Sequence, residues 1–128
     1  MMDSDLPSCN HGSHEIHPRL PLPADANVEN AVVMLRAAGD TARLRLLLLL
    51  VQGERCVTEL AGQEGEKIAT ISARLKHLHS ARLVKRRRVA KHVYYALADH
   101  HVVHFLRDIL DHASENNSSP QKNEGEIL

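Results

Sequence analysis

The chain has 128 residues, 43% of them hydrophobic, and its 16 basic residues balance its 16 acidic residues. This length suits one compact domain, whose core must be aliphatic because the chain has one Phe and no Trp. The longest apolar run, Leu46 to Val51, is far below the roughly 18 residues that span a bilayer, and the N-terminus lacks the basic and apolar regions of a signal peptide. We therefore expect a soluble, cytoplasmic protein with no membrane partner.

Residues 1–26 are rich in Pro, His and Ser. Pro18, Pro21 and Pro23 prevent a helix there, because proline lacks the backbone N–H that a helix interior needs. We expect this segment to be a flexible arm that precedes a folded domain over residues 27–115.

Two helices are predicted at the start of that domain. Apolar residues recur at helical spacing over residues 28–38, and Gly39, Asp40 and Thr41 then provide a stop and a new N-cap. Residues 42–52 are apolar on nearly all sides, which predicts a helix buried over most of its surface.

Residues 56–63 and 68–80 are predicted to form two short helices joined by a turn at residues 64–66, which is the spacing of a helix-turn-helix. Ile71, Leu75 and Leu78 form an inner apolar stripe on the second helix. The residues left to enter a groove of DNA are Thr70, Ala73, Arg74, Lys76 and His77.

Residues 82–97 change to strand periodicity, since Val93, Tyr95 and Leu97 alternate with more polar neighbours, and this predicts a β-hairpin with a basic tip. Between Lys67 and Tyr95 there are nine Lys or Arg residues and no Asp or Glu, which is typical of a surface that binds a polyanion. An ordinary solvated face would interleave acids with bases. The residues expected to contact phosphates are Arg86, Arg87, Arg88 and Lys91.

A last helix is predicted to begin at Asp99, its N-cap. His101 and His112 project from nearly the same side of this helix but lie roughly 16 Å apart along its axis, at 1.5 Å per residue. Zinc needs its nitrogen ligands about 2 Å away, so one chain cannot gather Asp99, His101, His112 and Glu115 around one ion. Two antiparallel copies would form two sites, each with two imidazoles and two carboxylates.

This donor set suits Zn(II) best, with Co(II), Cd(II) or Ni(II) as further candidates. An alternative is a solvated helix ridge that happens to be rich in His and acid. His100 or His104 could also substitute as a ligand, and Asp99 could serve only as a cap. After Glu115, an Asn-, Ser- and Pro-containing run predicts that the helix ends and that residues 116–128 form a disordered tail.

The predicted elements describe a mainly α fold with a β-hairpin wing, which is a winged helix-turn-helix. Residues 35–115 resemble the ArsR/SmtB family of metal-responsive transcriptional repressors, and within it the zinc-sensing SmtB branch. The segments that carry this resemblance are LRAAGDTARLRLLLLL, ERCVTEL, LKHLHSARLVKRRRVAKHVYYALADHH and DHASE.

The resemblance implies a homodimer that binds double-stranded operator DNA when metal-free and releases it when Zn(II) binds between the paired last helices. It also implies that metal-bound His112 is linked to the DNA-reading helix through Arg82 and the backbone of Leu78. Ser72 and Arg74 match positions expected to face DNA, and Ser72 is equally consistent with a plain surface residue.

A second metal site is a further implication. Cys56, followed three residues later by Glu59, matches the cysteine and acid of the family's other metal site. The arm could supply additional ligands from Cys9, His11, His14 and His17. The alternative is that Cys56 is a small buried apolar residue beside a solvated arm.

Two other function classes remain open: a winged-helix nucleic-acid-binding protein with no metal regulation, and a non-catalytic zinc-binding protein. An enzyme ranks last, because catalytic zinc needs three protein ligands and an open position beside a pocket, and the sequence resembles no such motif. We accordingly expect no small organic substrate.

Overall fold

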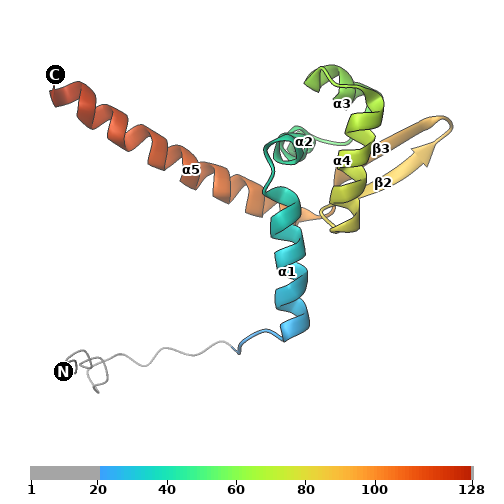
Figure 1. The fold of residues 1–128 in the computed structure, drawn as a ribbon, viewed down its shortest axis with the longest axis horizontal. Coiled ribbons are helices and arrows are strands. Elements are labelled where there is room, and N and C mark those ends of the chain that lie inside the picture. Colours follow the sequence, from blue (N-terminus) through green and yellow to red (C-terminus); the bar gives the residue numbers. More distant parts are fainter. Residues whose placement is uncertain (1–20, 128) are drawn as a thin grey trace.

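The structure is a computed structural model that describes residues 21–127, with the side chains of residues 21–115. Figure 1 shows α1 and α5 extending in different directions from a body formed by the other helices and the sheet. The predicted mainly α fold with a β-hairpin wing is confirmed. In chain order the elements are α1 (Asp25–Ala38), α2 (Thr41–Val51), β1 (Arg55–Cys56), α3 (Val57–Glu64), α4 (Ile68–Ser80), β2 (Val84–Val89), β3 (His92–Leu97) and α5 (His100–Ile127).

The helix bounds follow local sequence signals. The Asp40 carboxylate caps α2 by accepting the N–H of Arg43 over 3.1 Å, as the sequence predicted for this position. The Arg43 guanidinium then donates from Nε to the carbonyl of Ala37 over 2.7 Å, which ties the end of α1 to the start of α2. Gly65 ends α3 in the left-handed region, with φ of 65°, where a glycine has no steric cost.

Two predicted bounds need correction. Helix α1 begins at Asp25, inside the segment expected to be an arm, because the carbonyl of Ala24 already accepts the N–H groups of Asn27 and Val28. Helix α5 continues past Glu115 to Ile127, where the sequence predicted a disordered tail. Once a helix is nucleated by packed residues, each further residue with a backbone N–H adds one hydrogen bond at little extra cost, so weak helix formers can extend it.

The core is aliphatic apart from one tyrosine, and it lies between α2, α4 and the sheet. The predicted inner stripe of α4 is confirmed, since Ile71, Leu75 and Leu78 are all fully buried. Each such side chain contributes about 1.5–3 kcal/mol through its removal from water. The largest fully buried side chains are Tyr95, Leu46, Leu47, Leu60, Ile71, Leu75, Leu78 and Leu106.

The sheet has the strand order β1-β3-β2 and both pairings are antiparallel. The hairpin of β2 and β3 was predicted, whereas β1 was not. In the hairpin register Arg86 lies opposite Tyr95, and Arg87 lies opposite Tyr94. Because successive side chains in a strand point to opposite faces, Arg86 and Arg88 share one face of the wing and Arg87 lies on the other.

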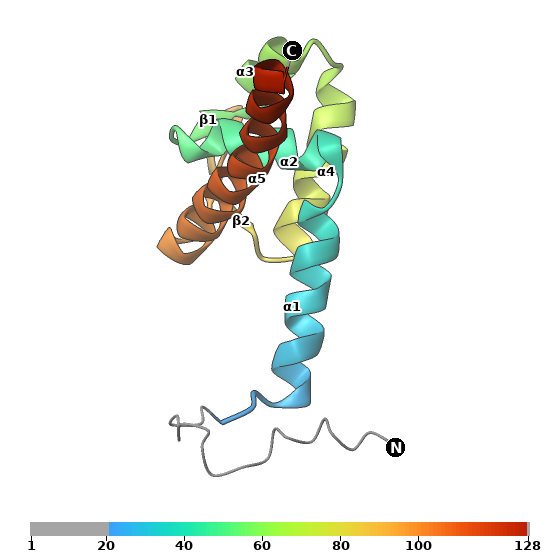
Figure 2. The same cartoon turned by 90° about the vertical axis from the view of Figure 1, so that its left-hand side faces the viewer.

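Helices α1 and α5 carry large apolar side chains on their exposed surfaces. Leu35 of α1 is 54% exposed and Phe105 of α5 is 42% exposed. Both side chains line an apolar groove of about 280 Å³ between these two helices. Figure 2, turned by 90°, shows α5 in front of the body and α1 extending below it.

Candidate metal centre and nucleic-acid interface

Asp99 caps the N-terminus of α5. Its Oδ1 accepts the backbone N–H groups of His101 at 2.9 Å and Val102 at 3.2 Å, which confirms the predicted N-cap. The N–H of Val102 is the largest cause of a pKa below the usual range for Asp99, so this carboxylate is charged at neutral pH. Both bonds end on Oδ1, which leaves Oδ2 able to bind a metal ion.

His101 lies beside this carboxylate, with its Nδ1 3.6 Å from Asp99 Oδ1. At the other end of the same exposed helix surface, His112 Nδ1 lies 4.0 Å from Glu115 Oε1. The two histidine side chains are 80% and 70% exposed, respectively. The structure therefore brings the four predicted ligands together as two pairs, each of one imidazole and one carboxylate.

Residues 21–115 contain no group of three or more His, Cys, Asp or Glu side chains that could hold a metal ion. Each pair on α5 supplies two donors, and a closed tetrahedral zinc site needs four. The donor types fit zinc, because imidazole nitrogens and carboxylate oxygens are common zinc ligands. Within residues 21–115, a complete site at either pair would therefore need donors from outside that pair.

The start of α5 is connected to the end of α4 by two successive backbone hydrogen bonds. Ala98 donates its N–H to the carbonyl of Leu83 over 3.0 Å, and Leu83 donates its N–H to the carbonyl of Leu78 over 3.0 Å. Arg82, within this turn, has φ of 64°, a left-handed conformation that is costly for a residue with a Cβ. Leu83 also lines the apolar groove together with His101.

The residues of α4 that were predicted to face DNA differ in their exposure. Ala73, Lys76 and His77 are exposed, whereas Thr70, Ser72 and Arg74 are partly buried. Arg74 also forms an ion pair with Glu66 in the turn before α4, with 3.6 Å between its Nη1 and Glu66 Oε2. Arg74 is therefore less free than its neighbours to approach a base.

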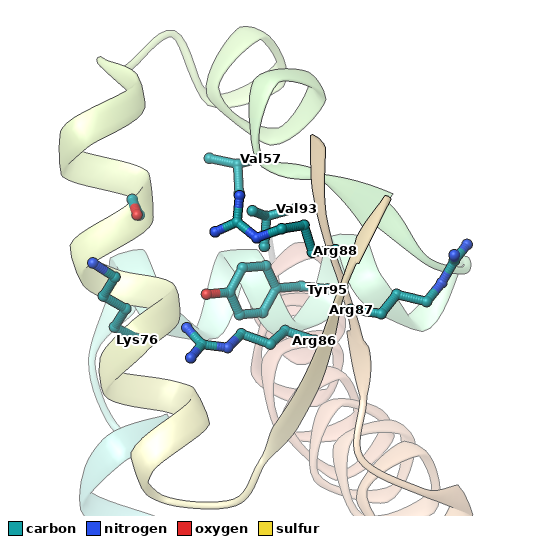
Figure 3. Close-up of a pocket in the computed structure, with 8 residues that line it drawn as sticks. Val57, Lys76, Arg86, Arg87, Arg88, Val93 and Tyr95 are labelled. Carbon is teal, nitrogen blue, oxygen red and sulfur yellow. The ribbon is translucent and has the colours of Figure 1, made fainter. Parts of the chain in front are cut away.

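Arg87 differs from the other wing arginines. Glu54 accepts two hydrogen bonds from its guanidinium, which also lies 5.0 Å from the centre of the Tyr94 ring. This pairing lowers the pKa of the Glu54 carboxyl. Arg86 and Arg88 instead point toward α4, where they line a cavity of about 380 Å³ with Lys76 (Figure 3).

The sequence did not single out Glu54 or Tyr95 as functional residues. Tyr95 lines the same cavity, and the alternation of the predicted strand could have placed it on the face opposite Tyr94. No sequence signal joins Glu54 to Arg87, which lies 33 residues further along the chain.

Cys56 is a half-buried free thiol at the start of α3. Its backbone N–H donates to Glu59 Oε1 over 3.0 Å, and this bond is the largest cause of a lowered pKa for Glu59. Cys56 and Glu59 are thus adjacent, as the second metal site would require. The other residues suggested for that site, Cys9, His11, His14 and His17, lie outside the described residues.

Within the described part of the chain, no helix is both long enough and apolar enough to cross a membrane.

Residues 40–86 match the protein family described as "bacterial regulatory protein, arsR family". The chain is 44% identical over 79 residues to a transcriptional repressor SmtB homolog from Synechocystis, covering 62% of this chain and 60% of that protein. It is 34% identical over 99 residues to the HTH-type transcriptional repressor SmtB of Mycobacterium tuberculosis, covering 77% of this chain and 73% of that protein.

A homodimeric winged helix-turn-helix DNA-binding domain from Mycobacterium bovis has a similar structure, with a TM-score of 0.69 and 33% identity. The match covers 72% of this chain and 85% of that domain. The AntR antimony-specific transcriptional repressor matches with a TM-score of 0.68 and 29% identity, over 78% of this chain and 91% of that one. These similarities in sequence and fold agree with the wing, the helix-turn-helix and the closing helix described above. The chain belongs to the ArsR/SmtB family of transcriptional regulators.

Proposed function

We propose that the protein is a metal-sensing transcriptional repressor that binds operator DNA as a metal-free homodimer and is released when Zn(II) binds between two α5 helices. The observation that carries this proposal is the pair of half-sites on α5. Asp99 with His101 and His112 with Glu115 are each preformed and exposed, yet one chain cannot join them. A second, antiparallel α5 would complete both sites at once.

The apolar surface of α1 and α5 supports dimer formation. Leu35, Phe105 and Ile109 are each more than 40% exposed, although burying side chains of this size is strongly favourable. The groove that Leu35 and Phe105 line also contains His101, so a partner seated there would lie beside one half-site. The homodimeric domain from Mycobacterium bovis has the same winged fold.

Bound Zn(II) would supply a fixed tetrahedral junction between the two chains. His101 and His112 would provide its nitrogen ligands, and Asp99 and Glu115 its oxygen ligands. Relatives of this chain include proteins named for cadmium resistance and for antimony specificity. The absence of a thiolate from the α5 pairs favours Zn(II) or Co(II) at this site.

The backbone connection between α5 and α4 gives metal binding a route to the DNA-reading helix. A shift of the start of α5 would move Ala98. The backbone of Ala98 is hydrogen-bonded to Leu83, and that of Leu83 is hydrogen-bonded to Leu78 at the end of α4. His112 of the metal site is the proposed further link to Arg82 and Leu78. Lys76 and His77 on α4, together with the basic wing, would contact DNA.

A second site at Cys56 and Glu59 is proposed as an accessory to the α5 sites, with ligands from the N-terminal arm. The adjacency of Cys56 and Glu59 supports it, since the Glu59 carboxylate reaches the Cys56 backbone. A thiolate there would extend the range of bound metals toward softer ions such as Cd(II).

The test is complementation between two variants that each lack one half-site. His101→Gln homodimers and His112→Gln homodimers should both fail to bind Zn(II) tightly. In a mixed dimer, the His112→Gln chain retains Asp99 and His101, and the His101→Gln chain retains His112 and Glu115. Mixing the two should therefore restore one tight Zn(II) site per mixed dimer.

Operator binding is measured in the same samples by fluorescence anisotropy on the DNA upstream of the protein's own gene. Zinc should release the wild-type protein and neither variant alone. Asp108→Asn is the matched control, because Asp108 is exposed on the same helix and belongs to neither pair. An operator affinity that zinc does not change would instead indicate a winged-helix protein without metal regulation. Zinc binding without DNA binding would indicate a non-catalytic zinc-binding protein.

A further inference from the structure

Two histidines at the start of α5, His100 and His104, are four residues apart and belong to neither zinc half-site. Residues at this spacing lie about 6 Å apart along a helix axis and roughly 40° apart around it, so their side chains are neighbours on one surface. Both side chains are exposed, and α5 extends away from the body of the domain (Figure 1). Within residues 21–115, neither ring takes part in a hydrogen bond or an ion pair. Their ring nitrogens are thus available to a ligand from solvent.

The relative orientation of these two rings suits a shared metal ion. The ring centres lie 6.0 Å apart and the ring planes cross at 87°. The lone pair of an imidazole nitrogen lies in the ring plane, so two crossed planes share a line along which both nitrogens can be directed at one ion. Two imidazoles whose nitrogens are each about 2 Å from the same ion have ring centres roughly 5 Å apart. A small rotation of either exposed side chain would close the remaining distance.

His101 lies beside His100 but does not belong to this pair. The rings of His100 and His101 have centres 4.1 Å apart and planes tilted by 33°. Planes so close to parallel meet too far from the rings for one ion to lie within a bond length of both. His101 lines the apolar groove with Phe105, whereas neither His100 nor His104 lines that groove. A partner chain seated in the groove would therefore leave the pair of His100 and His104 open to solvent.

The charge on this part of the chain favours a cation. From Asp99 to Glu115 there are four acidic residues and one basic residue, which are Asp99, Asp108, Asp111, Glu115 and Arg107. The N-terminus of a helix carries a partial positive charge, which by itself repels a cation. The Asp99 carboxylate caps this N-terminus and offsets that charge next to His100. The net negative charge raises the local concentration of cations around the two histidines.

We propose that His100 and His104 chelate one Cu(II) ion within a single chain, at a site separate from the zinc half-sites. Among the divalent first-row metals Cu(II) binds nitrogen donors most tightly, so a site with only two such donors favours it most. Its tetragonal geometry accepts two neighbouring imidazoles and leaves the other positions to water. Once one imidazole is bound, the second is held near the ion at a high effective concentration. The site needs neither a second chain nor DNA, so it does not rest on the function proposed above.

The experiment follows Cu(II) binding residue by residue in the metal-free, full-length chain. The background carries Cys9→Ser and Cys56→Ser, so that no thiol reduces or binds Cu(II). Paramagnetic Cu(II) broadens the NMR signals of nearby nuclei, and the backbone amides of Val102, Val103 and Phe105 report on this turn of α5. Signals from the rest of the chain report binding to other histidines, including those of the N-terminal arm. Cu(II) is titrated from well below one equivalent per chain.

His100→Gln and His104→Gln each remove one proposed ligand. Either change should raise the Cu(II) concentration that broadens the three amides by roughly tenfold or more, since a lone imidazole lacks the chelate effect. The double variant should bind little more weakly than either single variant, because both ligands belong to one site. His92→Gln is the matched control for the loss of an exposed histidine and should bind as the background does. Thermal unfolding checks that each variant is folded.

His112→Gln separates this pair from the proposed zinc sites. It removes a zinc ligand at the far end of the half-site surface and should leave the broadening of the three amides unchanged. A failure of the zinc response would therefore not affect the result.

Three results would overturn the proposal. One is broadening of the three amides at the same Cu(II) concentration in His104→Gln as in its background, which would mean that His104 is not a ligand. Another is equal loss of binding in His112→Gln and His104→Gln, which would place Cu(II) in a site between two chains. The third is broadening confined to signals from outside α5.

Discussion

Glu54 and Arg87 form a two-point ion pair, in which Glu54 Oε1 lies 2.7 Å from Arg87 Nη2 and Glu54 Oε2 lies 2.8 Å from Arg87 Nε. The pair joins the turn before β1 to the wing strand β2, so it holds the wing against the body of the domain. It also separates Arg87 from Arg86 and Arg88, whose guanidinium groups face α4. Three consecutive arginines thus divide into one that positions the wing and two that face the cavity.

Replacement of Glu54 by Gln should lower stability slightly at neutral pH. The ion pair lowers the pKa of Glu54, so its contribution is present above the carboxyl's unfolded pKa, about 4.3, and is lost as pH falls through the lower folded value. Thermal unfolding of wild type and Glu54→Gln should differ at pH 7 and converge near pH 3. Glu29→Gln, an exposed carboxylate on α1, is the control and should behave as wild type at both pH values. A difference that persists at pH 3 would contradict an origin in this pair.

A charge in the groove between α1 and α5 should disrupt the proposed dimer. Leu35→Glu would bury a carboxylate without a partner, which should weaken dimerisation by a factor of roughly ten or more. Sedimentation equilibrium measures this change, and zinc affinity should fall with it. Leu22→Glu introduces the same charge at a leucine that is 92% exposed and should leave the dimer intact. Retention of the wild-type dimer by Leu35→Glu would place the interface elsewhere.

The turn between α4 and β2 offers a test of how metal binding reaches α4. Arg82 has φ of 64°, so Arg82→Gly should relieve strain and change stability by at most about 1 kcal/mol, while removing the side chain proposed to receive the link from His112. Zinc should still bind, but the ratio of operator affinities without and with zinc should fall. Ala90→Gly, at φ of 55° in the wing turn, relieves similar strain and should retain the full zinc response. An undiminished response in Arg82→Gly would exclude this side chain from the link.

The Cys56 thiol should contribute to the binding of soft metals and not to the binding of Zn(II) at α5. Cys56→Ser should keep two tight Zn(II) sites per dimer, and it should remove the ultraviolet absorption band that a thiolate ligand gives on binding Cd(II). Cys9→Ser, measured in the same way, reports whether the N-terminal arm takes part. A Cd(II) band that is unchanged in Cys56→Ser would assign the thiolate to another residue.

Local periodicity accounts for most of the fold that could be predicted from the sequence. Helix α4 has the predicted bounds, because its apolar stripe and its flanking turns are all signals within about 15 residues. Strand β1 was missed because two residues, Arg55 and Cys56, carry no periodicity, and they form a strand only by pairing with Tyr95 and Tyr94. The continuation of α5 past Glu115 was missed because that segment has weak helix propensity.

In the candidate sites, too, contacts between residues close in sequence could be predicted, and contacts between residues far apart in sequence could not. Each half-site on α5 is set by a spacing of two or three residues, so both pairs could be predicted. Glu54 and Arg87 are 33 residues apart, and their contact depends on how β1 and β2 flank β3. The burial of Tyr95 depends on the packing of the wing against α4, which no sequence pattern specifies.

In the proposed sensor, the separation of the two half-sites along α5 would link metal sensing to protein abundance. Since a complete site would form only where two chains meet, metal binding would favour assembly and assembly would favour metal binding. At low copy number, dilution of the chains would lower the apparent affinity for metal. The threshold at which the regulator responds would then be set by how much of it the cell makes, as well as by the chemistry of its ligands.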